Sequence, residues 1–168
     1  GDEGDGWRVS LTTLMNERNA IGTGSGSGGP KRGSGAISSL VKIWNDTPED
    51  RRDAAARDRL MTLWTRAEVG RLTNMRARDN QKAGNPGPEM SVAKLEFALL
   101  NQAIMNEAVT MMGMDGQVGF DYTFRRPEDL SVDGSESGVQ HGFLRVRANS
   151  IEGGTSEIMR NIIGEQVL

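Results

Sequence analysis

The sequence predicts an all-α fold, and three observations lead to this prediction. Apolar residues recur every three or four positions along most of the chain, whereas the alternation typical of a half-buried strand is not sustained anywhere. Clusters of glycine, proline and asparagine divide the chain into a few long segments. Its 168 residues are the size of one ordinary domain. We therefore expect a single helical domain over 1–168, an up-and-down four-helix bundle with additional C-terminal helices.

The first expected helix spans about 7–21, with Asp5 and Gly6 as N-terminal flanking residues. Residues 22–35 follow it and hold seven of the 22 glycines. Such a segment has too little apolar surface to offset the entropy lost on ordering, so we expect a flexible Gly/Ser-rich loop. A phosphate-binding loop is disfavoured, because the required spacing of Gly, Lys and Ser/Thr and a preceding strand are both missing.

A short apolar helix is expected over 36–44, and residues 45–50 supply a stop and a new start, with Pro48 near a first-turn position. The long helix that follows is expected to end near Gly84. Arginines line the part of its circumference outside the expected buried side. Its expected buried side consists of Leu60, Met61, Leu63, Trp64, Ala67, Leu72 and Met75.

The segment 89–112 is predicted to be the central helix. It follows a break of glycine and proline at 84–88 and is apolar around most of its circumference, which is typical of a helix buried on several sides. Residues 113–138 are rich in Gly, Asp, Pro and Ser, and we expect irregular structure there. Two last helices are expected over 140–150 and 156–168.

The composition excludes several kinds of site. The chain has no cysteine and one histidine, His141, which excludes disulfides, thiol nucleophiles and histidine-rich metal sites. His141 is expected at the surface or at an interface. The net charge of -3 argues against nucleic-acid binding, and no apolar run approaches the length of a membrane span. We expect a cytoplasmic protein without a metal, of which this chain, beginning without methionine, is a piece.

Several segments resemble one known family along nearly the whole chain. Residues 151–168, IEGGTSEIMRNIIGEQVL, closely resemble the C-terminal signature of the acyl-CoA dehydrogenases. The opening residues 4–7, 11–14 and 16–18 resemble the start of that family's C-terminal helical domain. Residues 91–94, 108–109 and 113–116 resemble its next helices in the same order. The resemblance implies that the chain is the last part of a three-domain protein.

That resemblance implies an FAD-dependent oxidation of an acyl-CoA thioester, as in fatty acid β-oxidation. FAD would take the β-hydride and a glutamate base the α-proton. An electron-transfer flavoprotein or a similar acceptor is the implied partner. The implied assembly is a homo-oligomer, dimer or tetramer, or a mixed complex. The enzyme would be the full-length protein, and this chain alone is expected to be inactive.

Two glutamates are candidates for the base. In many family members the base directly precedes a Gly-Thr pair; setting Gly154-Thr155 on that pair places Gly153 at the base position and Glu152 one residue away. Another branch takes its base from the first helix, directly before an arginine, and Glu17-Arg18 matches that pair. We favour Glu17 as the base and Arg18 as a substrate contact, with Glu152 as the alternative. A Glu-Arg pair on a helix is also typical of solvated surface charge.

The resemblance also assigns cofactor contacts. Thr155 and Glu157, with Gly153 and Gly154, match positions near the flavin at the N-terminus of the last helix. In the alternative interpretation Thr155 or Ser156 only caps that helix, and Glu157 meets the positive end of its dipole.

Two further contacts match the family less closely. Thr110, with residues 113–116, matches the segment that meets the adenine half of FAD across a subunit boundary, although the family's usual Gln and Gly-Gly are replaced. Arg57, or else Arg59, would stand for the arginine of an Arg-x-x-Phe-Gly motif that has no clear counterpart here. These departures support a second hypothesis, a catalytically silent partner subunit or interaction module of an acyl-CoA dehydrogenase complex.

Overall fold

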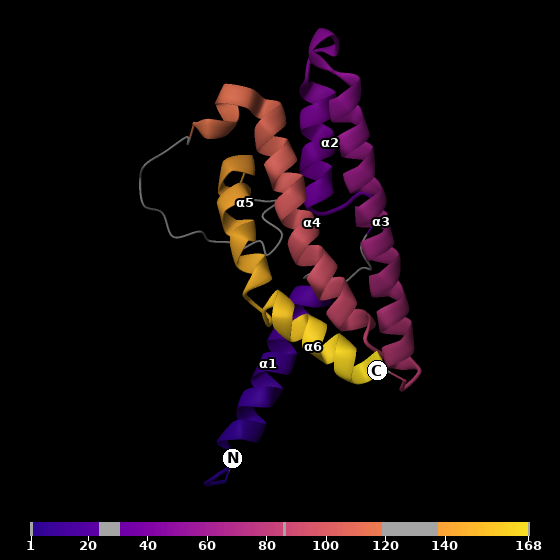
Figure 1. The fold of residues 1–168 in the computed structure, drawn as a ribbon, viewed down its shortest axis with the longest axis vertical. Coiled ribbons are helices and arrows are strands. Elements are labelled where there is room, and N and C mark those ends of the chain that lie inside the picture. The colour runs from indigo at the N-terminus through magenta and orange to yellow at the C-terminus, as the bar shows by residue number, and fades with distance from the viewer. Residues whose placement is uncertain (1, 24–30, 86, 119–137, 168) are drawn as a thin grey trace.

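The structure of the chain, a computed structural model, describes residues 2–23, 31–85, 87–118 and 138–167. Every regular element assigned within these ranges is a helix, which confirms the all-α prediction (Figure 1). The elements are α1 (Gly6–Thr23), α2 (Ala36–Asp46), η1 (Glu49–Arg51), α3 (Ala54–Lys82), α4 (Glu89–Met112), η2 (Gly113–Gln117), α5 (Val139–Arg145), η3 (Val146–Ser150) and α6 (Ser156–Val167). The elements labelled η are short 3-10 helices.

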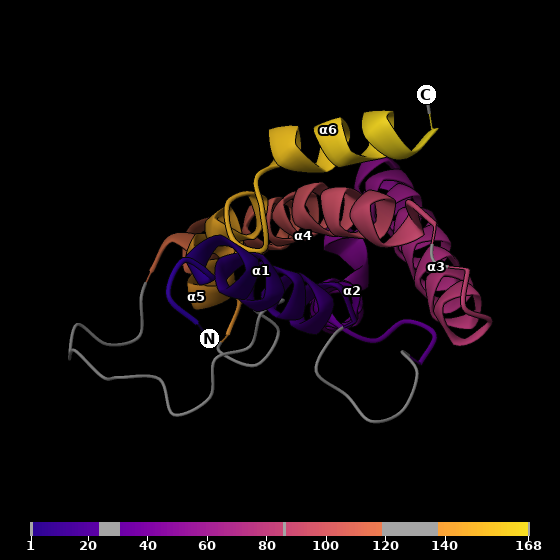
Figure 2. The same cartoon turned by 90° about the horizontal axis from the view of Figure 1, so that it is seen from below.

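Helix α4 is the centre of the fold. It contacts α1, α2, α3, α5 and α6, as well as η2 and η3. Figure 2 shows α6 crossing on one side of α4 while α1 and α2 lie on the other. The bounds of α4 match the sequence prediction, because Pro88 precedes its first residue and Gly113, at φ 61°, ends it. The prediction that it is buried on several sides is also confirmed, since nine of its residues are buried.

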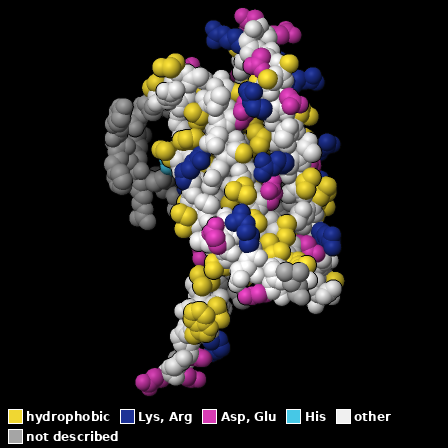
Figure 3. Space-filling model, viewed as in Figure 1, with side chains coloured by type: hydrophobic (Ala, Val, Ile, Leu, Met, Phe, Trp, Pro, Cys, Tyr) yellow, Lys and Arg dark blue, Asp and Glu magenta, His cyan; other side chains and the backbone are white. Residues whose placement is uncertain are grey.

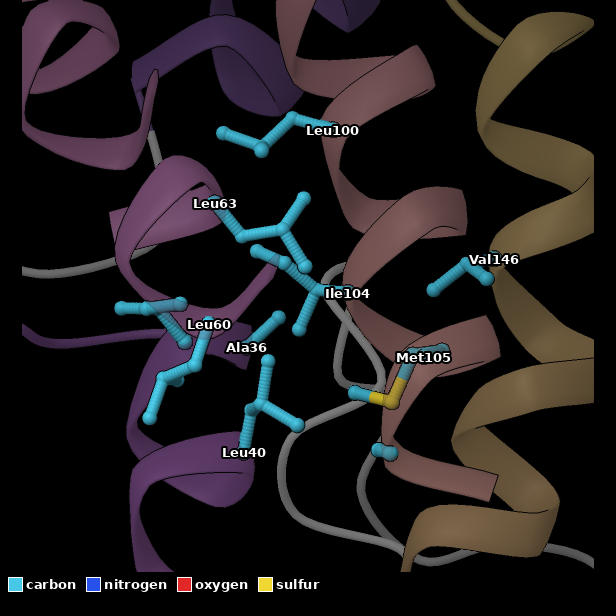
Figure 4. Close-up of a cluster of buried hydrophobic side chains, with 10 residues drawn as sticks. Ala36, Leu40, Leu60, Leu63, Leu100, Ile104, Met105 and Val146 are labelled. Carbon is cyan, nitrogen blue, oxygen red and sulfur yellow. The ribbon is translucent and has the colours of Figure 1, made fainter. Parts of the chain in front are cut away.

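The main core lies between α2, α3 and α4 and extends to η3 (Figure 4). Leu40 of α2 is completely buried and packs in the same cluster as Leu60 and Leu63 of α3. The same cluster includes Ala36 of α2, Leu100, Ile104 and Met105 of α4, and Val146 of η3, all labelled in the close-up. Burial of these apolar side chains is the main stabilising contribution of the bundle.

The start and the buried face of α3 differ from the sequence prediction. Pro48 precedes the 3-10 turn η1, and α3 begins only at Ala54, where the Asp53 carboxylate accepts a hydrogen bond of 2.6 Å from the Ala56 N–H. The expected buried side was wrong for three residues, since the exposed apolar side chains of α3 include Met61, Leu72 and Met75. Met61 follows Leu60 by one residue, which turns it about 100° around the helix and away from the core.

Charged side chains of both signs intermingle on the surface formed by α3 and α4 (Figure 3). Three ion pairs join the two helices: Arg59–Glu107 at 2.9 Å, Arg66–Glu96 at 2.8 Å and Arg76–Glu89 at 3.2 Å. Helix α1 extends away from the bundle, and its exposed apolar side chains include Trp7, Val9, Leu11 and Leu14.

The first helix is longer than the sequence predicts. Helix α1 continues to Thr23, so it includes two residues of the expected loop 22–35. Residues 24–30 and 119–137 lie outside the described ranges, and the predictions of a flexible loop and of irregular structure there stay predictions. In the part of the chain that the structure describes, no helix is long and apolar enough to cross a membrane. The same residues include no group of three or more metal-ligating side chains.

Candidate functional site

The candidate site is the loop between η3 and α6, where it meets α1. The backbone N–H of Gly153 donates a hydrogen bond of 3.0 Å to Oε1 of Glu17. The two residues are 136 positions apart in the sequence, so only the tertiary fold brings them together. The candidate base from the first helix therefore lies directly against the Gly-Gly-Thr segment of the C-terminal signature.

The loop backbone requires glycine at two consecutive positions. Gly153 has φ 66° and Gly154 has φ 98°, a region that residues with a Cβ rarely adopt. Just before them, the N–H groups of Ile151 and Glu152 both donate to the Ala148 carbonyl at 2.9 Å, which closes a turn at the end of η3. This turn and the two left-handed glycines together set the direction of the Gly153 N–H.

Glu152 is held by the chain itself. The guanidinium of Arg145 donates to both carboxylate oxygens, at 3.1 and 2.9 Å, and the two side chains are only 19% and 22% exposed. Asn149 Nδ2 donates a further hydrogen bond of 2.6 Å to Oε1 of Glu152. Such a bidentate pair is strong and directional, so the carboxylate of Glu152 is fixed against Arg145.

A buried polar cluster lies beneath the loop. Asn149 is completely buried, and its Oδ1 accepts a hydrogen bond of 3.3 Å from Asn101 Nδ2 of α4. Lys94 of α4 is 1% exposed, and its Nζ donates to the carbonyl oxygens of Asn149 at 3.0 Å and Gly154 at 2.5 Å. These contacts join both ends of the loop to the central helix.

Thr155 and Glu157 lie at the N-terminus of α6. The Ile158 N–H donates to the Thr155 hydroxyl at 3.4 Å, which is a long N-capping contact. The pKa of the Glu157 carboxyl is lowered by its hydrogen bond with its own backbone N–H, then by that with Thr155 and by the charge of Arg160. Thr155 therefore caps α6, and a cofactor contact at Thr155 and Glu157 stays a prediction.

The other predicted cofactor contacts lie at the opposite end of the bundle. Thr110 is in the last turn of α4, and its exposed hydroxyl donates to the Asn106 carbonyl of the same helix at 2.8 Å. Arg57 is exposed in the first turn of α3, close in sequence to Arg59, which pairs with Glu107. Sixteen residues of α4 separate Lys94, beneath the loop, from Thr110, which corresponds to about 24 Å of helix.

Arg18 and His141 are the two other residues that the sequence singled out. The backbone of Arg18 belongs to α1, but its side chain lies outside the described part of the structure. His141 is exposed on α5, as expected.

Sequence reasoning missed the roles of Lys94, Asn149 and Arg145. One signal was available for Lys94, because it is a cation within a helix that is apolar around most of its circumference. Asn149 and Arg145 carried no comparable signal, since their partners are defined by the turn that η3 makes before α6.

The fold and the site define a helical domain of the kind that presents a carboxylate from its first helix to a glycine loop before its last helix. Residues 4–168 match the family model described as acyl-CoA dehydrogenase, C-terminal domain, and the chain belongs to this family.

Similar proteins carry the same family name. The chain is 30% identical over 169 residues to the acyl-CoA dehydrogenase FadE34 of Mycobacterium tuberculosis. It is 31% identical over 173 residues to the acyl-CoA dehydrogenase IpdE1 of the same organism, and 31% identical over 169 residues to IpdE1 of Mycolicibacterium smegmatis. Each match covers the whole chain, but the chain spans only 20% of the first relative and 39% and 38% of the other two.

Proposed function

We propose that the intact protein is an FAD-dependent acyl-CoA dehydrogenase, cytoplasmic, in which Glu17 takes the α-proton of an acyl-CoA thioester. The observation that carries this proposal is the hydrogen bond between the Gly153 N–H and Oε1 of Glu17. It joins Glu17, the favoured candidate base, to the loop that the signature motif forms.

The contacts of the two glutamates favour Glu17 over Glu152. A general base needs an oxygen directed at the proton that it removes. Both oxygens of Glu152 accept hydrogen bonds from Arg145, and one also accepts from Asn149, so proton transfer to Glu152 would disrupt a bidentate pair. Glu17 has an exposed side chain in this chain, where a substrate held by the rest of the intact protein could reach it.

The Gly153 N–H orients the carboxylate of Glu17. A carboxylate has two oxygens with several lone pairs, so a hydrogen bond to Oε1 restricts its rotation while leaving capacity to accept a proton. Fixing a reacting group before the reaction lowers the entropy that the reaction must lose. Arg18, the next residue of α1, would contact the substrate.

The residues at the loop fit a flavin on the chemistry of their donors. Thr155 offers a hydroxyl, the first turn of α6 offers backbone N–H groups, and Gly153 and Gly154 allow close approach to the backbone. Glu157 lies at the same helix terminus. When bound there, FAD would be the acceptor for the hydride from the β-carbon.

Thr110 and Arg57 would contact a second FAD, held by a neighbouring subunit. Their separation of about 24 Å of helix from the loop supports this division, because the two ends of the bundle then serve different cofactors. This arrangement requires an oligomer, and an electron-transfer flavoprotein or a similar acceptor would reoxidise the flavin.

The second candidate is a catalytically silent partner subunit. It is favoured because side chains at the two weakly matched cofactor positions have partners within the chain. Thr110 donates a hydrogen bond to its own helix, and Arg59 pairs with Glu107. The two candidates differ in the colour of the purified intact protein. A yellow protein bleached by acyl-CoA supports the enzyme, and a colourless one supports the silent subunit.

The direct test is Glu17→Gln in the intact protein. The amide oxygen of glutamine can still accept from the Gly153 N–H, so the loop contact is kept while the base is lost. We expect normal FAD content and a fall in kcat of about 10²–10⁴-fold, the usual contribution of a general base. Glu165→Gln, on the exposed part of α6, is the matched control and should retain full activity. Normal turnover in Glu17→Gln with normal FAD content would remove Glu17 as the base.

A further inference from the structure

Lys94 is a buried cation that the proposed reaction does not use. It is 1% exposed and lies in α4 between Ala93, also buried, and the half-buried Leu95. A charged side chain is rarely buried unless it is paired or hydrogen-bonded, because it loses its hydration. A lysine at this depth therefore needs the partners it has, and a methionine would fill a similar volume without them.

The partners of Lys94 are parts of the candidate site. Its Nζ donates to the carbonyl oxygen of Asn149 at 3.0 Å and to that of Gly154 at 2.5 Å. Asn149 lies near the end of η3, and Gly154 lies two residues before the first residue of α6. One ammonium group thus holds both ends of the loop, and charge-assisted hydrogen bonds of this kind are stronger than neutral ones.

Two adjacent glycines connect the contact of Lys94 with the contact of Glu17. Gly154, whose carbonyl is held by Lys94, directly follows Gly153, whose N–H donates to Glu17. Only the φ and ψ angles of the two glycines separate that N–H from that carbonyl, and both residues have backbone conformations that only glycine adopts readily. A segment of two glycines keeps its direction only if it is held at both ends, so the direction of the N–H depends on the Gly154 anchor as well as on the turn at Ala148.

We propose that Lys94 is a positioning residue, which fixes the Gly153–Gly154 segment from below so that the Gly153 N–H holds the carboxylate of Glu17. The proposal rests on the proposed function for its catalytic consequence. Its structural part, the anchoring of the loop by the Lys94 ammonium, is independent of that function.

The structural part is tested by hydrogen–deuterium exchange on the intact protein, followed in peptides that cover 149–157. We expect Lys94→Met to raise exchange in these peptides by about tenfold or more, because the carbonyl anchors are lost while the volume is retained. Ile104→Ala is the control for a general loosening of α4, because it perturbs another buried side chain of this helix, one that faces the core shared with α2 and α3. Unchanged exchange in Lys94→Met, or an equal rise in Ile104→Ala, would overturn the anchoring.

A second measurement covers the case in which Lys94→Met does not fold. In the wild-type protein, reductive methylation should modify Lys94 about 100-fold more slowly than the exposed Lys42 and Lys82. Comparable rates at the three lysines would show that the ammonium is not held under the loop, and the proposal would fail.

Lys94→Arg, which keeps a cation with several donors, should restore part of the exchange protection.

The catalytic part is tested by steady-state kinetics of the same variants. Lys94→Met should lower kcat by about tenfold or more and change KM by less than about threefold, because substrate contacts are intact while the base loses its orientation. A loosened loop with an unchanged kcat would refute the positioning role. If Glu17→Gln also turns over normally, the proposed function has failed, whereas the exchange experiment still decides whether Lys94 anchors the loop.

Discussion

Replacing Leu40 by alanine tests the placement of the core against that of the surface. Leu40 is 0% exposed in α2, whereas Leu72 of α3 is 54% exposed although its sequence context predicts burial. The two substitutions Leu40→Ala and Leu72→Ala remove the same atoms, so any difference in their effect reports the environment of each side chain.

The magnitude follows from the buried atoms. Three carbons are removed, and each buried methylene contributes about 0.8 kcal/mol, which gives about 2.4 kcal/mol for complete burial. The cavity left at Leu40 adds to this, so we expect a loss of about 3–4 kcal/mol. At Leu72 about half of the side chain is already in water and solvent fills the space, so we expect a loss of at most about 1 kcal/mol.

The assay is equilibrium urea unfolding of the 168-residue chain, followed by far-ultraviolet circular dichroism. Leu40→Ala should lower the unfolding midpoint several times more than Leu72→Ala, with similar slopes for both. Equal losses in the two variants would show that Leu72 is buried in solution, and the assignment of the outer face of α3 would then be wrong.

Two more predictions concern the contact between Glu68 and the loop before α2. Gly33→Ala should destabilise the chain by about 2–4 kcal/mol, because φ is 72° and the added Cβ would meet the Trp64 ring; Gly84→Ala, at φ 73° with open space, should cost about 1 kcal/mol in the same urea assay. Burial works against ionisation of Glu68, but the Arg71 and Gly33 N–H hydrogen bonds and nearby arginine charges lower its pKa overall. Its stabilising effect should therefore be complete above the ordinary glutamate pKa and be lost as pH falls through the lowered value. Urea midpoints should show Glu68→Gln less stable than wild type at neutral pH and the difference shrinking on acidification; a constant difference would contradict the pKa direction.

Helix α4 shows why local signals sufficed for part of the fold. Its bounds were predictable because proline before Glu89 and glycine after Met112 act within one turn of the helix. Its central place was predictable too, since a helix that is apolar around most of its circumference must be covered on most sides.

Helix α3 shows where local signals failed. A helix of 29 residues with many arginines carries apolar residues on more than one side, and only those in line with Leu60 and Leu63 face the core. Met61 and Leu72 contribute to the apolar content without lying on that line. The start of α3 also depended on Asp53, whose capping role is visible only once the 3-10 turn before it is known.

The sequence by itself determined the all-α class, the central helix and the two candidate glutamates, because spacing, helix-breaking residues and a signature motif are local properties. It also placed Gly153 and Gly154 next to the last helix. Only the tertiary structure decided which partners each glutamate has. Glu17 accepts a hydrogen bond from the Gly153 N–H, 136 positions away in the sequence, while Glu152 is paired with Arg145. The physical reason is that a hydrogen bond or an ion pair depends on where helices cross, and that follows from packing of the whole bundle.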